Sequence, residues 1–129
     1  MRKSRGFSLI EVMVAIVILG IVITTTISMF AERQKRLKQA NETILAYQAL
    51  ANEAEIWRRI DFASLDGQPP VFQSDLTILA PLAPYTTAVR IDTTRPDTKN
   101  ITLTVRWSSA QRTAKLGIVR VDTGGSSLW

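Results

Sequence analysis

An uninterrupted apolar run near the start of the chain, VMVAIVILGIVI at residues 12–23, restricts the possible folds more than any other segment. The largely apolar stretch from Phe7 to Phe30 would be about 36 Å long as a helix with a rise of about 1.5 Å per residue. A bilayer core is about 30 Å thick, and a segment in lipid must satisfy its own backbone hydrogen bonds. We therefore expect residues 7–30 to form a membrane-spanning helix. A cleaved secretory signal is the alternative, but the run is long for such a signal and no A-x-A-like site follows it.

Residues 31–60 are expected to continue this helix with a different surface. Gly and Pro are absent between Ile21 and Ile60, and apolar side chains recur at steps of three and four residues. This periodicity predicts an amphipathic helix with one apolar stripe that packs against a head. The predicted stripe consists of Leu37, Ala40, Ile44, Tyr47, Leu50, Ala51, Ala54 and Trp57.

The remainder, residues 61–129, is expected to be a small β-sheet head. The segment DGQPP at residues 66–70 cannot continue a helix, and the apolar pattern beyond it has a period of two. The predicted strands cover residues 85–92, 101–108 and 113–122, and the third has a bulge or an ambiguous register at Gly117. Residues 93–100 and 108–112 form turn-sized linkers, which predicts an antiparallel meander, and residues 71–82 form a short strand or an irregular connection. The predicted fold class is α+β, with a long N-terminal helix packed against a small antiparallel sheet.

Composition excludes several kinds of chemistry. The chain has no Cys and no His, so disulfides, thiolate chemistry, a Ser-His-Asp relay and the usual zinc sites are excluded. Asp92, Asp97 and Asp122 are too far apart in sequence to form a calcium loop. We therefore predict that the protein is not an enzyme, with no catalytic residue, metal site or cofactor.

The net charge of +5 is a weak guide to partners because of where the charge lies. Basic residues cluster within the first six residues and just after the apolar run, whereas residues 61–129 carry seven basic and six acidic side chains. A DNA-binding head is the competing hypothesis, with Trp107 and Tyr85 available to stack on bases. Its basic residues would be Arg90, Arg95, Lys99, Arg106, Arg112, Lys115 and Arg120. The same residues also fit an ordinary solvated strand face, so we expect no nucleic-acid partner.

The residues that precede the apolar run, RGFSLIEV, combine a basic leader ending in Gly6, the aromatic Phe7 and the acid Glu11. This pattern resembles the prepilin motif of type IV filament systems, a family that includes type IV pilins and type II secretion pseudopilins. The resemblance implies that a prepilin peptidase cuts between Gly6 and Phe7 and N-methylates Phe7. It also implies a single-pass protein of the bacterial inner membrane with a cytoplasmic leader and a periplasmic head, an orientation that the charges alone leave open.

The resemblance assigns a role to each part of the chain. Residues 1–6 form the cleaved leader, residues 7–30 the transmembrane and filament-core helix, residues 31–60 its amphipathic half, and residues 61–129 a pilin-like head. The implied partners are the peptidase, other pilin or pseudopilin subunits that contact the N-terminal helix, and an inner-membrane assembly platform.

Glu11 is the unusual member of the motif, because a charged side chain within a membrane costs about 2.5–3.5 kcal/mol on insertion scales. Cleavage would create an amine on Phe7, four residues away, and a helix would place both groups on one face. The resemblance implies instead that Glu11 meets the amine of a neighbouring subunit, which would select one axial register. The partner chain is left open, and a solvated Glu11 without a docking role is the alternative.

Several departures distinguish the chain from abundant pilins. Residues 23–28 contain no proline, and the head has neither a disulfide nor a calcium loop. The chain is thus similar to minor subunits such as the I-type minor pseudopilin or the V-type minor pilin. The expected function is to initiate or cap the periplasmic pseudopilus for type II protein secretion. The alternative is a minor pilin of a type IV pilus that acts in assembly, adhesion, motility or DNA uptake.

Overall fold

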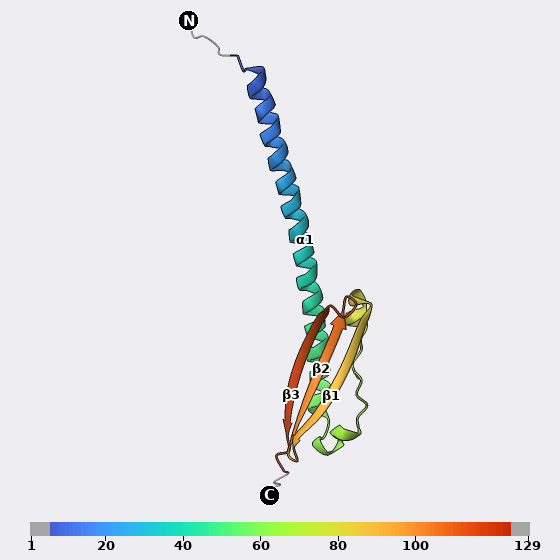
Figure 1. Cartoon of the computed structure of the whole chain (residues 1–129). Helices are drawn as coiled ribbons and strands as arrows, with labels where there is room; N and C mark the ends of the chain where they lie inside the picture. Colours follow the sequence, from blue (N-terminus) through green and yellow to red (C-terminus); the bar gives the residue numbers. More distant parts are fainter. Residues whose placement is uncertain (1–5, 125–129) are drawn as a thin grey trace. The chain divides into compact units, whose positions relative to one another are not determined.

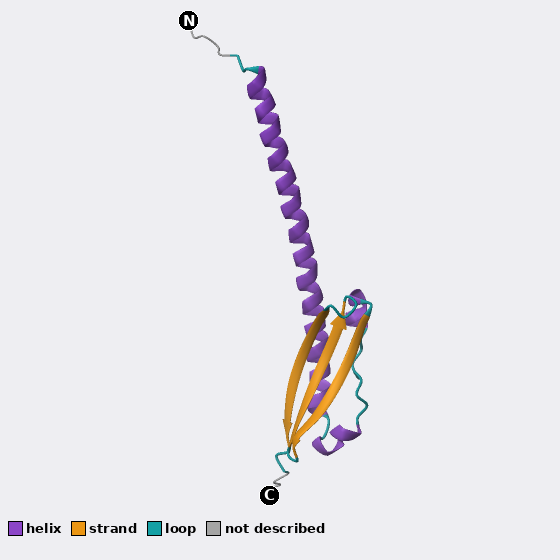
Figure 2. Cartoon of the chain, viewed as in Figure 1, coloured by secondary structure: helices purple, strands orange, loops and turns teal. Residues whose placement is uncertain are grey.

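The computed structural model describes residues 6–124, so the predicted leader lies outside it except for Gly6. The elements are α1 (Leu9–Arg59), the 3-10 helices η1 (Phe62–Gly67) and η2 (Thr77–Leu82), and the strands β1 (Tyr85–Arg95), β2 (Thr98–Trp107) and β3 (Arg112–Val121) (Figure 1). Contacts divide the chain into one unit that ends at Gln39 and a second that begins at Ala40, and α1 continues through the boundary. A long N-terminal helix with a three-stranded antiparallel sheet confirms the predicted α+β class (Figure 2).

The sheet is a meander of order β1-β2-β3. Tyr85 pairs with Trp107 at one end of the first hairpin, and Trp107 in turn pairs with Arg112 of β3. The strands extend further than predicted, because only Pro96 and Asp97 separate β1 from β2. Residues 93–100 read as a linker because they are polar, but the hydrogen bonds of a sheet join main chains and do not require apolar side chains.

One local prediction is wrong, and one open alternative is resolved. The bulge or ambiguous register expected at Gly117 does not occur, since Gly117 pairs with Thr102 in an unbroken register. Residues 71–82 contain no strand and are an irregular connection that ends in η2. At the start of η2, Thr77 donates hydrogen bonds to Asp75 from its hydroxyl and its backbone N–H, which lowers the pKa of that carboxyl.

The hydrophobic core lies within the unit that begins at Ala40. It is built from one face of α1, the inner face of the sheet and apolar side chains of the connection between them. Its largest fully buried apolar residues are Trp57, Leu50, Leu65, Leu79, Ile101, Leu103 and Val105. Each such side chain contributes about 1.5–3 kcal/mol when fully buried, so α1 supplies part of the stability of the head.

The apolar stripe predicted for residues 31–60 is correct only at Leu50, Ala54 and Trp57, since its other members are exposed. Leu37, Ile44 and Tyr47 belong to the predicted stripe but are 60%, 54% and 49% exposed. The buried residues of α1 are Ala46, Ala49, Leu50, Glu53, Ala54 and Trp57. Small alanines allow a helix to approach a sheet closely, yet they weigh little in a periodicity dominated by large side chains.

Glu53 is a buried acid that joins α1 to the connection before the sheet. Its side chain is fully buried, and one oxygen accepts from Trp57 Nε1 at 2.6 Å and from the Gln73 backbone N–H at 2.9 Å. The other oxygen accepts from the Ser74 backbone N–H at 2.8 Å and from Gln73 at 3.1 Å. Both oxygens are therefore satisfied by N–H donors, as a buried carboxyl group requires.

A second polar contact joins α1 to the end of the sheet at the turn between β2 and β3. Glu42 Oε2 accepts from Trp107 Nε1 at 3.2 Å and from an Arg112 guanidinium nitrogen at 2.9 Å. The Arg112 guanidinium also lies 5.5 Å from the centre of the Trp107 ring. Glu42 thus fixes both partners of one β2–β3 residue pair.

Two basic side chains on the inner face of the sheet, near the turn between β1 and β2, bind groups of η1 and of the C-terminal end of α1. Lys99 Nζ lies 3.0 Å from an Asp66 carboxylate oxygen and 3.1 Å from the Phe62 carbonyl oxygen. Arg120 donates to the Trp57 carbonyl oxygen at 2.8 Å. A cation at the C-terminal end of a helix satisfies carbonyls that have no partner within the helix.

The turn between β2 and β3 holds three consecutive non-glycine residues in the left-handed region. Ser108, Ser109 and Ala110 have φ values of 55°, 55° and 66°, and this conformation costs a non-glycine residue roughly 1–2 kcal/mol. Ala110→Gly is therefore expected to raise the free energy of unfolding by about 1 kcal/mol. Urea denaturation of the full chain in detergent measures the change.

Ala88→Gly provides the matched control for that turn. Ala88 is exposed in the extended strand β1, where glycine is expected to lower stability by roughly 0.5–1 kcal/mol. Equal destabilisation by both glycines would contradict the strain assigned to Ala110.

Candidate processing and docking site

The predicted cleavage junction lies outside the helix. Gly6, Phe7 and Ser8 precede α1, and all three are exposed. A Cβ added at Gly6 would meet nothing within 4 Å, and Phe7 is 81% exposed. The peptide bond between Gly6 and Phe7 is therefore in a non-helical, accessible stretch of backbone.

Glu11 lies in the first turn of α1, which begins two residues later than the predicted start at Phe7. The Ser8 carbonyl oxygen accepts hydrogen bonds from the backbone N–H groups of Glu11 at 3.0 Å and Val12 at 3.2 Å. An acid at this end of a helix is stabilised by typically about 0.3–1 kcal/mol through the helix dipole. The position thus favours Glu11 even before any amine is present.

Ser8 is a residue whose structural role the sequence reasoning missed. Ser8 and Glu11 have the S-x-x-E spacing of a capping box, a pattern that marks helix N-termini. That signal was available in the sequence but was interpreted only as part of the motif. It locates the helix start after the cleavage junction.

Phe7 and Glu11 line the same shallow hollow on the surface of this segment. The other lining residues are Val12, Val14, Ala15, Ile16, Ile18 and Leu19. Glu11 is thus the acid of an otherwise apolar surface. In the uncleaved chain Phe7 precedes the helix and Glu11 lies in its first turn, and the two residues border one surface.

The residues that follow form an apolar and exposed helix surface. An 18-residue segment of α1 has a mean hydropathy of 2.5, and none of its residues is buried. By length and composition the helix could cross a membrane. Large side chains such as Ile10, Ile16 and Leu19 are 68%, 63% and 57% exposed. Nothing within the described chain covers this surface.

Hydroxyl groups in the second half of the apolar segment donate hydrogen bonds to main-chain carbonyls of the same helix. The acceptors are main-chain carbonyls three or four residues earlier, and the donors are Thr24, Thr25, Thr26 and Ser28, at distances of 2.7–3.0 Å. Such bonds satisfy polar groups that lipid cannot solvate, and α1 continues through them without a break.

Comparison with known proteins bears on this region alone. Residues 1–27 match the family model described as the prokaryotic N-terminal methylation motif. The chain carries a type IV prepilin-like methylation motif. No curated protein and no solved structure matches the chain. The methylation motif implies processing by a prepilin peptidase and assembly with other pilins, and an apolar helix directly behind it fits a membrane-anchored, pilin-like protein.

The residues proposed for DNA binding do not form an open interface. Trp107 is only 3% exposed, and Lys99 is 5% exposed. Lys99, Arg112 and Arg120 contribute to the internal contacts of the head described above. The other basic residues of the sheet are Arg90, Arg95, Arg106 and Lys115, and Arg90 pairs with Asp92 at 2.9 Å. The combination of a stacking tryptophan with seven accessible cations is therefore absent from the described head.

Proposed function

We propose that this chain is a structural minor subunit of a type IV filament-like assembly, a minor pseudopilin that helps initiate or cap the periplasmic pseudopilus for type II protein secretion. The observation that carries the proposal is the methylation motif followed by an exposed apolar helix with Glu11 in its first turn. A minor subunit is favoured by the small head without Cys and by the absence of proline at residues 23–28. No catalytic role belongs to the proposal.

The proposed topology has the leader in the cytoplasm and the head in the periplasm. The inner membrane holds the chain until the assembly platform and neighbouring subunits draw its helix into a filament. Accessible backbone at Gly6 and Phe7 supports cleavage at that bond and methylation of Phe7, because a peptidase needs a non-helical substrate. No group of three or more His, Cys, Asp or Glu residues among residues 6–124 could hold a metal ion, and the proposal requires none.

The processing step is tested by expressing the full chain in membranes with and without a prepilin peptidase. Intact-mass measurement is expected to show loss of residues 1–6 and the gain of one methyl group only when the peptidase is present. Gly6→Leu is expected to stop cleavage, since a bulky side chain would occupy the space next to the scissile bond. Gly6→Ala is the matched control and is expected to be cut. Cleavage at another bond, or equal cleavage of both variants, would contradict the assignment.

A minor pilin of a type IV pilus remains the second candidate, because the methylation motif is common to both systems. Neighbouring genes separate the two. A secretin gene with several small prepilin genes would support secretion, whereas a retraction ATPase gene would support a pilus.

A further inference from the structure

Four basic residues follow the apolar surface of α1 within six positions: Arg33, Lys35, Arg36 and Lys38. All four are exposed. We call them the cationic belt. With Glu32 as the neighbouring acid, the segment from 32 to 38 carries a net charge of +3. The proposed filament function does not use this concentration of charge.

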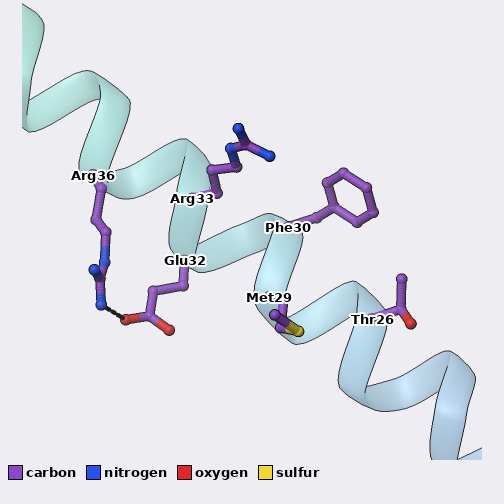
Figure 3. Close-up of a pocket in the computed structure, with 6 residues that line it drawn as sticks. All are labelled: Thr26, Met29, Phe30, Glu32, Arg33 and Arg36. Atoms are coloured by element: carbon purple, nitrogen blue, oxygen red, sulfur yellow. Dashed lines mark hydrogen bonds and ion pairs between the residues drawn. The ribbon is translucent and has the colours of Figure 1, made fainter.

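The cationic belt surrounds the helix. Successive residues are about 100° apart around a helix, so relative to Arg33 the other three lie at about 200°, 300° and 140°. Figure 3 shows the Arg33 and Arg36 side chains pointing in different directions, with Arg36 reaching toward Glu32 and Arg33 pointing away from it. A protein partner usually meets one face of a helix, whereas lipid headgroups surround a helix where it leaves the membrane.

Internal pairing leaves most of this charge available. Arg36 lies 2.6 Å from Glu32, but their side chains are 76% and 62% exposed, and pairs of this kind contribute little. Within the described chain, Arg33, Lys35 and Lys38 form no salt bridge. Their ammonium and guanidinium groups are therefore free to bind an external anion.

The position along the helix matches a membrane interface. Glu11 and Arg33 are 22 positions apart in the sequence, or about 33 Å along a helix, which is close to the thickness of a bilayer core of about 30 Å. Met29 and Phe30 are 73% and 63% exposed just before the belt, and Phe30 and Arg33 border the same hollow. Arginine and lysine stems can lie along such apolar surface while their charged ends reach the headgroups.

We propose that the cationic belt binds the phosphate groups of anionic phospholipids in the head-side leaflet and so fixes the depth of the helix before assembly. The inference rests on the membrane anchoring in the proposed function. Arginine and lysine both bind phosphate strongly, arginine through paired N–H donors. Cleavage after Gly6 would remove Arg2, Lys3 and Arg5, so in the mature chain the belt is the cation cluster that borders the apolar segment.

The test uses the full chain reconstituted in phosphatidylcholine vesicles that contain a trace of spin-labelled phosphatidylglycerol or spin-labelled phosphatidylcholine. The fraction of immobilised label gives the relative association of the two lipids. The wild type is expected to prefer phosphatidylglycerol by at least about fivefold, the contribution of roughly one basic residue near an anionic surface. Changing all four belt residues to Gln is expected to reduce the preference to about onefold, and added salt to weaken it in the wild type.

The head offers a control with the same loss of charge. Arg90, Arg95, Arg106 and Lys115 are all exposed, and their joint change to Gln is expected to leave the lipid preference intact. An unchanged preference in the belt variant, or a preference that the head variant also loses, would overturn the proposal. A belt variant that keeps its lipid preference but fails to enter filaments would instead assign the belt to a protein partner.

Flotation with pure phosphatidylcholine vesicles separates this proposal from the anchoring on which it rests. Wild type, belt variant and head variant are all expected to float, because the apolar helix remains. A wild type that does not float would contradict membrane anchoring itself. A chain that floats without any preference for phosphatidylglycerol would overturn only the lipid-binding role.

Discussion

Glu11→Val is expected to reduce incorporation of the chain into filaments by at least about tenfold. The variant would lose the contact between the Glu11 carboxylate and a Phe7 amine, which would be buried in the filament. Leaving a buried charge without its partner costs more than the ~1.4 kcal/mol that corresponds to a tenfold change. Cleavage after Gly6 and membrane insertion are expected to continue, since removal of a charge makes the segment easier to insert. The measurement compares the amount of the chain in sheared filaments with the amount in the membrane, and intact mass verifies processing.

Glu32→Val is the matched control, because Glu32 is an exposed acid of the same helix. This variant is expected to enter filaments normally. Normal incorporation of the Glu11 variant would contradict the docking role. Glu11 would then act only by stabilising the first turn of α1. Loss of cleavage in the Glu11 variant would make its filament result a processing defect and contradict the separation of the two steps.

Glu53→Ala is expected to lower the free energy of unfolding of the head by at least about 3 kcal/mol, because three N–H donors would each lose a buried acceptor at a cost of about 1–3 kcal/mol. The donors belong to Trp57, Gln73 and Ser74. Urea denaturation in detergent, followed by tryptophan fluorescence, measures the change. Since small domains are stable by only about 5–15 kcal/mol, this loss is a large part of the total.

Two further variants make this result interpretable. Glu53→Gln keeps one acceptor oxygen and is expected to have an intermediate effect even if the alanine variant does not fold. Glu55→Ala removes an exposed acid that lies 3.0 Å from Arg58, and it is expected to change stability by less than about 1 kcal/mol. Similar effects at positions 53 and 55 would contradict the role assigned to the buried carboxyl group.

The sequence predicted the helix, the meander and the motif because each has a short-range signal. The apolar run and the period-two alternation follow directly from which groups must avoid water. Sequence reasoning failed where the partner lies far away in the chain. Glu53 looks like a solvent-exposed residue until the N–H groups of Gln73 and Ser74 are placed against it.

The candidate site shows a similar division. The spacing of Gly6, Phe7 and Glu11 identifies the motif, whereas the start of α1 at Leu9 follows from a different signal, the capping pattern that begins at Ser8. The sequence already disfavours the DNA-binding alternative, but only the structure reveals that Lys99 and Trp107 lie on the inner face of the sheet. The sequence gives the number of basic residues in the head, but it does not show which of them bind groups within the head.

The bonds between α1 and the head have a mechanical consequence. Glu42, Glu53 and the Trp57 carbonyl each hold a different part of the head. Because all three belong to one helix, a pull on its N-terminal end is shared among several attachments, and they must be broken before the sheet can separate. Forced unfolding is governed by the rate of such a rupture. We therefore expect the sheet to stay attached to α1 when force is applied along the helix.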